Sequence, residues 1–309
     1  MTNKVWITAA VTGGIHTPSM SPYLPQTPEQ IIEDAVSAYE AGAAIVHIHA
    51  RKPEDGKPSS DVSEIKEIAW AIKKRCDVII EITTGGAPGM NLEERIASIP
   101  LLKPEMASLN AGSINFVISP AADSLKKQGA RYDWEIQYLE SSFDFIFSNS
   151  FKAMERYCLT MNDVCTRPEF EIYDVSMITN IAFFIKKGVV KTPPYLQFVM
   201  GILGGIPATV DNLAYLVKTA REQLVDFQWS VAAAGRYQFP MAAAALAMGG
   251  HVRVGLEDNL FIRPKILARS SAEQVNQVRE IAERIGLQIA TAAETRAALK
   301  LKGTDKTLF

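Results

Sequence analysis

The sequence predicts a (β/α)8 barrel, built as a single domain over residues 1–309. Eight short β-branched or aromatic runs recur along the chain, and nearly every run is followed by a turn and a helical pattern. The predicted strands are 5–10, 44–50, 78–84, 106–110, 170–174, 195–201, 228–234 and 251–258. A doubly wound open sheet is the alternative, but no Gly-rich dinucleotide fingerprint followed by an acid supports it.

Start and stop signals bound the helices between these strands. Residues 27–30, Thr-Pro-Glu-Gln, form a capping box with proline in the first turn, and Gly42 ends the helix that follows. Asp61 and Glu64 repeat this device before the second helix. Further helical patterns cover 91–99, 151–165, 177–187, 209–224, 238–248 and 272–286. The stretch 111–149 does not fit the alternation, and we expect an extra hairpin there, inserted after strand 4.

Composition and charge exclude several classes of protein. Hydrophobic residues make up 48% of the chain and charged residues 21%, which is typical of a folded globular protein. The net charge of −2 leads us to expect neither nucleic acid nor a membrane surface as a partner. No apolar stretch approaches the roughly 20 residues of a membrane span. Three irregularly spaced cysteines and the lack of a secretory pattern indicate a cytoplasmic protein.

Two histidines end the second predicted strand. His47 and His49 point to the same face of a regular strand, and paired imidazoles held in register are a zinc-ligand geometry. A catalytic zinc ion usually has a third protein ligand. The last strand ends in Glu257 and Asp258, and we assign Glu257 to the metal and Asp258 to the chemistry. His16, in the loop after strand 1, is a candidate substrate or metal contact. Core histidines and a helix-capping acid pair are the structural alternatives.

Polar residues also follow other predicted strands, at the end where barrel enzymes carry their active sites. Strand 3 ends in Thr83 and Thr84, followed by the glycines at 85–86, and these hydroxyl and backbone N–H groups suit an anion or an oxyanion. Strand 4 ends in Ser108 and Asn110, which could hydrogen-bond a carboxylate. Arg236 follows strand 7, where it could bind a substrate carboxylate or orient the acid assigned to the chemistry.

The chain resembles the β-keto acid cleavage enzymes in five segments: VHIHAR, ITTGG, SLNAGSINF, WSVAAAGR and RVGLEDN. The resemblance covers almost the whole chain. It implies a (β/α)8 barrel in which His47, His49 and Glu257 hold zinc, although such ligands also suit other divalent transition metals. It also implies acetyl-CoA as co-substrate and a homotetramer.

By the same resemblance, the catalytic residues are Asp258, Arg236 and Thr83, and the substrate-binding residues are Gly86, Ser108 and Asn110. The implied reaction condenses a β-keto acid with acetyl-CoA and yields acetoacetate and an acyl-CoA. Zinc would act as a Lewis acid while Asp258 removes the proton between the keto and carboxylate groups, and retro-Claisen cleavage would separate the products. A CoA-independent, metal-assisted aldolase or lyase is the alternative reaction, and a metabolite-binding barrel is the alternative outside enzymes.

One departure from the resemblance concerns the substrate. The aminohexanoate enzymes of the family have an acidic side chain in the loop after strand 1, suited to a substrate ammonium. This chain reads Thr-Gly-Gly-Ile at 12–15 and has no charge there. We therefore expect a β-keto acid with an uncharged or anionic acyl tail.

Overall fold

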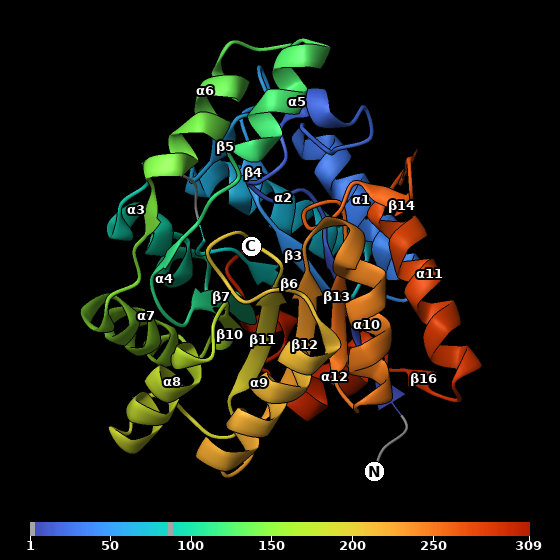
Figure 1. The fold of residues 1–309 in the computed structure, drawn as a ribbon. Helices are drawn as coiled ribbons and strands as arrows, with labels where there is room; N and C mark the ends of the chain where they lie inside the picture. Colours follow the sequence, from blue (N-terminus) through green and yellow to red (C-terminus); the bar gives the residue numbers. More distant parts are fainter. Residues whose placement is uncertain (1–3, 86–88) are drawn as a thin grey trace.

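The structure, a computed structural model, describes residues 4–85 and 89–309. Eight parallel strands close into a barrel in the order β10, β11, β12, β13, β2, β3, β6, β7, which confirms the predicted fold (Figure 1). Each strand overlaps its predicted run. The bounds are β2 Ile7–Ala10, β3 Ile45–Ile48, β6 Ile79–Ile82, β7 Met106–Asn110, β10 Arg167–Ile172, β11 Tyr195–Met200, β12 Gln228–Ala233 and β13 His251–Val254.

Helices surround the barrel and begin where the capping signals predict. The Thr27 side chain accepts a hydrogen bond from the Gln30 backbone at the start of the first helix, and Gly42 ends that helix in the left-handed conformation. The predicted helix 91–99 is divided into two short helices at Ala97. The bounds are α1 Pro28–Ala41, α2 Val62–Arg75, α3 Leu92–Ile96, α4 Ser98–Leu102, α7 Phe151–Asp163, α8 Ser176–Lys186, α9 Val210–Gln223, α10 Gln238–Ala247, α11 Ser271–Arg284 and α12 Ala292–Leu299.

The insertion after β7 is larger than the expected hairpin. Strand β8 (Ile114–Asn115) pairs antiparallel with β9 (Ile146–Phe147), so the two hairpin strands are present. Between them lie α5 (Pro120–Gln128) and α6 (Trp134–Ser141), which pack on each other around Leu125 and Leu139. These two helices, green in Figure 1, extend beyond one end of the barrel, opposite α12. The aromatic runs on either side of these two helices favoured strands, so the sequence analysis did not predict the helices between them.

Smaller pairings complete the fold. Strand β1 (Lys4–Val5) pairs with β16 (Gln288–Ile289), β4 (Ala50–Arg51) pairs with β5 (Pro58–Ser59), and β14 (Phe261–Arg263) pairs with β15 (Ile266–Leu267). A continuous apolar core lies between the strands and the helices. Within the described ranges, no helix has the length and apolar character needed to cross a membrane.

Candidate active site

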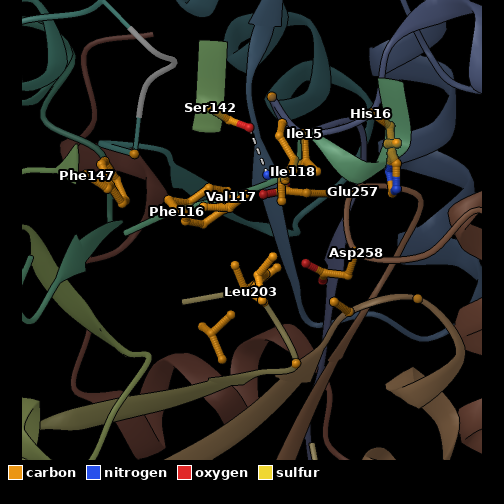
Figure 2. Close-up of a pocket in the computed structure, with 18 of the residues that line it drawn as sticks. Ile15, His16, Phe116, Val117, Ile118, Ser142, Phe147, Leu203, Glu257 and Asp258 are labelled. Carbon is orange, nitrogen blue, oxygen red and sulfur yellow. Dashed lines mark hydrogen bonds between the residues drawn. The ribbon is translucent and has the colours of Figure 1, made fainter. Parts of the chain in front are cut away.

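A cavity of about 340 Å³ opens at the carboxyl ends of the barrel strands. One part of its lining is polar and comprises His47, His49, Thr83, Glu171, Arg253, Glu257 and Asp258. The rest is mainly apolar and includes Ile15, Phe116, Val117, Ile118, Phe147 and Leu203 (Figure 2). The cavity therefore has a polar end for charged reacting groups and an apolar wall for the remainder of a ligand.

The two histidines and Glu257 converge at the polar end. Nε2 of His47 is 3.1 Å from Nε2 of His49, and Oε1 of Glu257 is 3.4 Å from Nε2 of His49. The ligand atoms of the three residues lie within 4.8 Å of one another. His47 lies in β3 and His49 directly after it, so the spacing of two residues brings both rings to one place, as predicted.

This set of donor atoms fits a divalent metal ion. Burial lowers the pKa of both histidines, so their imidazoles are neutral near pH 7, the form that binds metals. Burial alone would raise the pKa of Glu257, but the charge of Arg253 holds it well below its ordinary value. Among the described residues, Oε2 of Glu257 is buried without a hydrogen-bond partner, which a metal ion would supply. Two imidazoles and one carboxylate beside an open cavity are typical of a catalytic zinc site.

Two carboxyl groups lie behind His47. Nδ1 of His47 is 3.2 Å from Oε2 of Glu81, which occupies the paired position on β6. Glu169, on β10, interacts with Glu81 in turn, and burial raises the pKa of both carboxyl groups. The pair therefore retains a proton near neutral pH, and Glu81 still offers an oxygen to Nδ1–H of His47. That hydrogen bond leaves the lone pair of Nε2 facing the ligand cluster.

Asp258 lies beside this cluster and is held by Arg253. Arg253, in β13, is 4% exposed and donates hydrogen bonds to both carboxylate oxygens of Asp258, at 2.9 and 3.0 Å. The same guanidinium lies 2.8 Å from Glu257 and 3.5 Å from Glu171, so three carboxyl groups surround it. Burial raises the pKa of Asp258, and the charge of Arg253 opposes this rise. A carboxylate with a raised pKa beside a cavity is suited to accept a proton from a substrate.

The side chain of Arg236 does not contact Asp258 in this structure, and its predicted contact with a substrate carboxylate stays a prediction. Arg236 belongs to a short 3-10 helix, Gly235–Tyr237, is exposed, and donates a hydrogen bond from Nη2 to the Tyr237 hydroxyl at 2.7 Å. The contact with Asp258 that we expected of Arg236 is made by Arg253 instead. The sequence signal for Arg253 was its place inside the RVGLEDN segment, on the last barrel strand itself rather than after one.

Thr83 lines the cavity directly after β6, as expected. Its Oγ1 accepts a hydrogen bond from the backbone N–H of Gly85 at 3.0 Å, which fixes the side chain at the cavity surface. Gly86, the predicted substrate contact beside it, lies outside the described residues.

Ser108 and Asn110 are buried behind the cavity lining rather than in it. Oγ of Ser108 accepts a hydrogen bond from the backbone N–H of Thr84 at 3.1 Å. Nδ2 of Asn110 donates to Oε2 of Glu171 at 2.5 Å. In this structure the two residues therefore support groups beside the cavity, and their predicted substrate contacts stay predictions.

Arg51, the last residue of the HxHxR segment, fixes the loop that leads from β2 into α1. It is fully buried, and its guanidinium donates to the backbone oxygens of Thr12, Gly13, His16 and Gly56. Gly13 has a positive φ of 60° and packs directly on Glu257, because a Cβ at this position would lie 2.2 Å from Cγ of Glu257. The loop therefore positions a metal-ligand candidate.

His16 lines the cavity but lies outside the group of three metal-ligand candidates. Its Nδ1 is 2.9 Å from the carbonyl oxygen of Leu256. Because a carbonyl only accepts, Nδ1 carries the proton and Nε2 is left as an acceptor. Burial lowers the pKa of His16 to about 4, so the ring is neutral at pH 7.

The apolar wall depends on the insertion. Tyr138, in α6, donates a hydrogen bond from its hydroxyl to the Gly14 backbone oxygen at 2.6 Å. The backbone N–H of Ile118 donates to Oγ of Ser142 at 2.9 Å, drawn as a dashed line in Figure 2. Leu203, from the loop after β11, adds a further apolar side chain. The two helices missing from the sequence prediction therefore help to build the site.

Known proteins resemble the chain over nearly its full length. A family model described as beta-keto acid cleavage enzyme matches residues 4–301. The 3,5-dioxohexanoate:acetyl-CoA acetone transferase of Paraburkholderia graminis is 47% identical, covering 99% of this chain and 98% of its own. The 3-keto-5-aminohexanoate cleavage enzyme of Acetoanaerobium sticklandii is 39% identical over 96% and 98% of the two chains. The 3-oxoadipate:acetyl-CoA acetyltransferase of Cupriavidus necator is 32% identical over 99% and 98%.

Solved structures agree with the fold. The apo structure of ObcA matches with a TM-score of 0.74 at 23% identity, covering 91% of this chain and 66% of the longer ObcA chain. At this identity the likeness bears on the fold alone. The family match and the relatives, taken with the cluster of two histidines and a glutamate, lead to one conclusion: the chain belongs to the beta-keto acid cleavage enzyme family.

Proposed function

We propose that the protein is an acetyl-CoA-dependent acyltransferase that converts a β-keto acid and acetyl-CoA into acetoacetate and the CoA thioester of the remaining acyl fragment. One observation carries the proposal: a candidate metal site and an Asp258 held by Arg253 share the polar end of one cavity. Family membership makes the chain a carbon–carbon-bond-cleaving enzyme. Two of the relatives are named for acetyl-CoA-dependent transfer, which supports acetyl-CoA as the co-substrate.

His47, His49 and Glu257 would hold the metal, for which we propose zinc. When bound, the ion would supply a Lewis acid for the keto and carboxylate oxygens of the substrate. Analysis of the purified protein for bound metals tests this part of the proposal. Zinc at about one ion per chain, absent from a His49→Ala variant, is the expected result, and no bound divalent metal would contradict it.

Asp258 would start the reaction by taking a proton from the carbon between the keto and carboxylate groups. That carbon then attacks the acetyl carbonyl of acetyl-CoA, and the CoA thiolate leaves. The thiolate attacks the original keto carbon, the bond to the acetoacetate carbon breaks, and this carbon recovers the proton from Asp258. The acyl fragment departs as its CoA thioester. Arg253 would hold Asp258 in one orientation during both proton transfers, and Thr83 would present its hydroxyl to the substrate.

The apolar wall favours a substrate with an uncharged tail. The side chains of Ile15, Phe116 and Leu203 offer no partner to a charged group. Among the described residues, Arg253 is the one Arg or Lys of the lining. It already contacts Asp258, and this argues against a second carboxylate on the tail. The relative at 47% identity is named for 3,5-dioxohexanoate, whose tail carries a ketone and no charge. We propose short β-keto acids with uncharged tails of this kind as substrates.

An assay with purified protein, acetyl-CoA and a panel of β-keto acids tests the reaction. The panel contains 3,5-dioxohexanoate, 3-oxoadipate and 3-keto-5-aminohexanoate, and mass spectrometry follows acetoacetate and new acyl-CoA species. We expect both products from 3,5-dioxohexanoate and neither from a Glu257→Gln variant. Cleavage without acetyl-CoA would instead support the CoA-independent lyase. The homotetramer and the cytoplasmic location stay proposals, and sedimentation tests the former.

A further inference from the structure

A second cavity, of about 250 Å³, lies at the opposite end of the barrel from the candidate active site. Helix α7, the start of β10, the segment before β11 and the segment after α12 contribute to it. Arg167, the first residue of β10, lines this cavity, whereas Glu171 on the same strand lines the active-site cavity. Four residues of strand separate the two, or about 13 Å.

The cationic residues that line this cavity are Arg167, Lys191, Lys300 and Lys302. Its lining in the described part of the chain contains no Asp or Glu. The rest of the wall is mainly apolar and includes Phe170 and Val190, with Asn162 and Thr166 as neutral polar members. The lining therefore combines four cationic side chains with a mainly apolar surface.

The guanidinium of Arg167 is only partly satisfied. Its Nη2 donates to the backbone oxygen of Pro193, but its buried Nε has no hydrogen-bond partner within the described ranges. Burial lowers the pKa of Arg167, and no carboxylate in the described ranges offsets this effect. Arg296, also partly buried, shows the usual arrangement, because it pairs with Glu105 at 2.9 Å. A half-buried guanidinium that lines a cavity and has no carboxylate partner among the described residues is suited to bind an anion.

The three lysines of the lining differ in their contacts. Lys302 donates a hydrogen bond to the backbone oxygen of Val164 at 2.7 Å, and this bond holds its ammonium group at the cavity. Lys191 and Lys300 are exposed, and neither forms a salt bridge with any residue of the described part. Both are therefore available to a negatively charged ligand.

We propose that this cavity binds a small organic anion, with a phosphate or carboxylate group against Arg167 and a short apolar body against Phe170 and Val190. Lys191 and Lys300 would add charge at the rim. The bound anion would join the segment after α12 to strand β10, so its binding would stabilise the folded chain.

Calorimetric titration tests the proposal with three probes: inorganic phosphate, phenyl phosphate and benzoate. Sodium chloride keeps the ionic strength the same in all three titrations, so that differences in charge screening do not affect the comparison. We expect one saturable site per chain with a Kd below about 1 mM for at least one of the aromatic probes. The phosphate and carboxylate probes distinguish the two head groups. Heats that grow linearly without saturation for all three probes would overturn the proposal.

Variants locate the site. Arg167→Met should weaken binding about tenfold or more, because it removes charge-assisted hydrogen bonds but keeps the aliphatic stem. The double variant Lys191→Met/Lys300→Met changes only exposed side chains and should weaken binding severalfold without loss of folding. If Arg167→Met does not fold, the double variant still tests whether the anion binds in this cavity. Lys66→Met, an exposed lysine of α2, is the matched control and should bind as the parent does.

A titration of Glu257→Gln excludes phosphate bound at the candidate metal site as the source of the signal. The proposal expects undiminished binding in this variant. Binding that is unchanged in Arg167→Met and in the double lysine variant, or that is lost in Glu257→Gln, would place the anion elsewhere and contradict the proposal.

Discussion

Arg253 holds Asp258 by two parallel hydrogen bonds, from Nε to Oδ2 at 2.9 Å and from Nη2 to Oδ1 at 3.0 Å. The same Nη2 lies 2.8 Å from Oε1 of Glu257. One guanidinium thus contacts both the proposed base and a proposed metal ligand. A two-point contact fixes the plane of the Asp258 carboxylate as well as its position, which a single ammonium group does not do.

Replacement of Arg253 should therefore reduce catalysis more than replacement of Arg236. In Arg253→Lys the charge remains but the two-point contact is lost, and we expect kcat to fall by about 100-fold or more. Arg236→Lys is the matched control, since Arg236 is exposed and contacts Tyr237 rather than Asp258. Steady-state kinetics of both variants check this expectation. A larger loss in Arg236→Lys would restore the assignment made from the sequence.

Glu81 should act on metal binding through His47. Its Oε2 lies 3.2 Å from Nδ1 of His47, on the side of the ring away from the ligand cluster. In Glu81→Ala the imidazole loses this partner, and we expect the affinity for zinc to fall about 10- to 100-fold. Competition with a chromophoric chelator measures the affinity directly, without an activity assay. An unchanged affinity in a variant that keeps its Tm would contradict a positioning role.

The strands and the metal-ligand candidates could be predicted from the sequence because each depends on local spacing. His47 and His49 share a face by the period of a strand, and Glu257 lies in the turn that directly follows β13, which ends at Val254 rather than at the predicted 258. The contact between Arg253 and Asp258 was not predictable in the same way. It depends on the turn between the two residues, which folds the chain back after β13.

The insertion and the Glu81–Glu169 pair were missed for different reasons. Helices α5 and α6 are short and bury few side chains, around Leu125 and Leu139, and the aromatic runs next to them gave the stronger signal, for strands. Glu81 sits in the apolar run of β6, and its pairing with His47 follows from the register of two strands. Register between strands is a tertiary property that single-strand patterns do not specify.

Ile15 should select the charge of the substrate tail, because its side chain lines the cavity (Figure 2). Ile15→Glu places a carboxylate there, and we expect it to shift kcat/KM by about tenfold or more toward 3-keto-5-aminohexanoate and away from 3,5-dioxohexanoate. Ile15→Gln has a similar shape without the charge and is the control. Equal effects of both variants would show that size, and not charge, determines the preference.

Gly204 should be needed for the cavity wall to form. Its φ is +103°, and a Cβ there would lie 1.7 Å from the backbone oxygen of Asn115, next to the hydrogen bond from Val117 N–H to Leu203 O at 3.2 Å. Gly204→Ala should separate the loop after β11 from the insertion and raise KM severalfold. Gly188→Ala is a matched control, because Gly188 also has a positive φ, of +76°, but open space around it.

Comparison of the two glycine variants distinguishes the cost of backbone strain at a positive φ from the cost of the steric clash made by the new Cβ. Both should lower the free energy of unfolding by about 1–2 kcal/mol through the unfavourable backbone conformation. Only Gly204→Ala should add a further loss from the clash, and only it should change KM. Urea unfolding and steady-state kinetics of the two variants measure these effects. A KM that rises equally in Gly188→Ala would show that general destabilisation is the cause.

Asp34 should make the stability of the chain depend on pH. It lies in α1, and its Oδ1 accepts a hydrogen bond from the backbone N–H of Ser271 at 2.9 Å, while its buried Oδ2 has no partner among the described residues. Burial raises the pKa of Asp34 to about 6, from an ordinary value of 3.8. The folded state therefore binds the proton more tightly than the unfolded state. This contribution is fully present below pH ~4 and is lost as pH rises through 6.

Asp34→Asn isolates the effect, because the amide keeps an acceptor for Ser271 and does not titrate. As pH rises from 4 to 7, the free energy of unfolding of the parent should fall relative to that of the variant by about 2 kcal/mol. Urea unfolding at half-unit steps of pH measures the difference between the two proteins, so other titrating groups cancel. A difference that stays constant across this range would mean that the Asp34 carboxyl group titrates alike in the folded and unfolded chains.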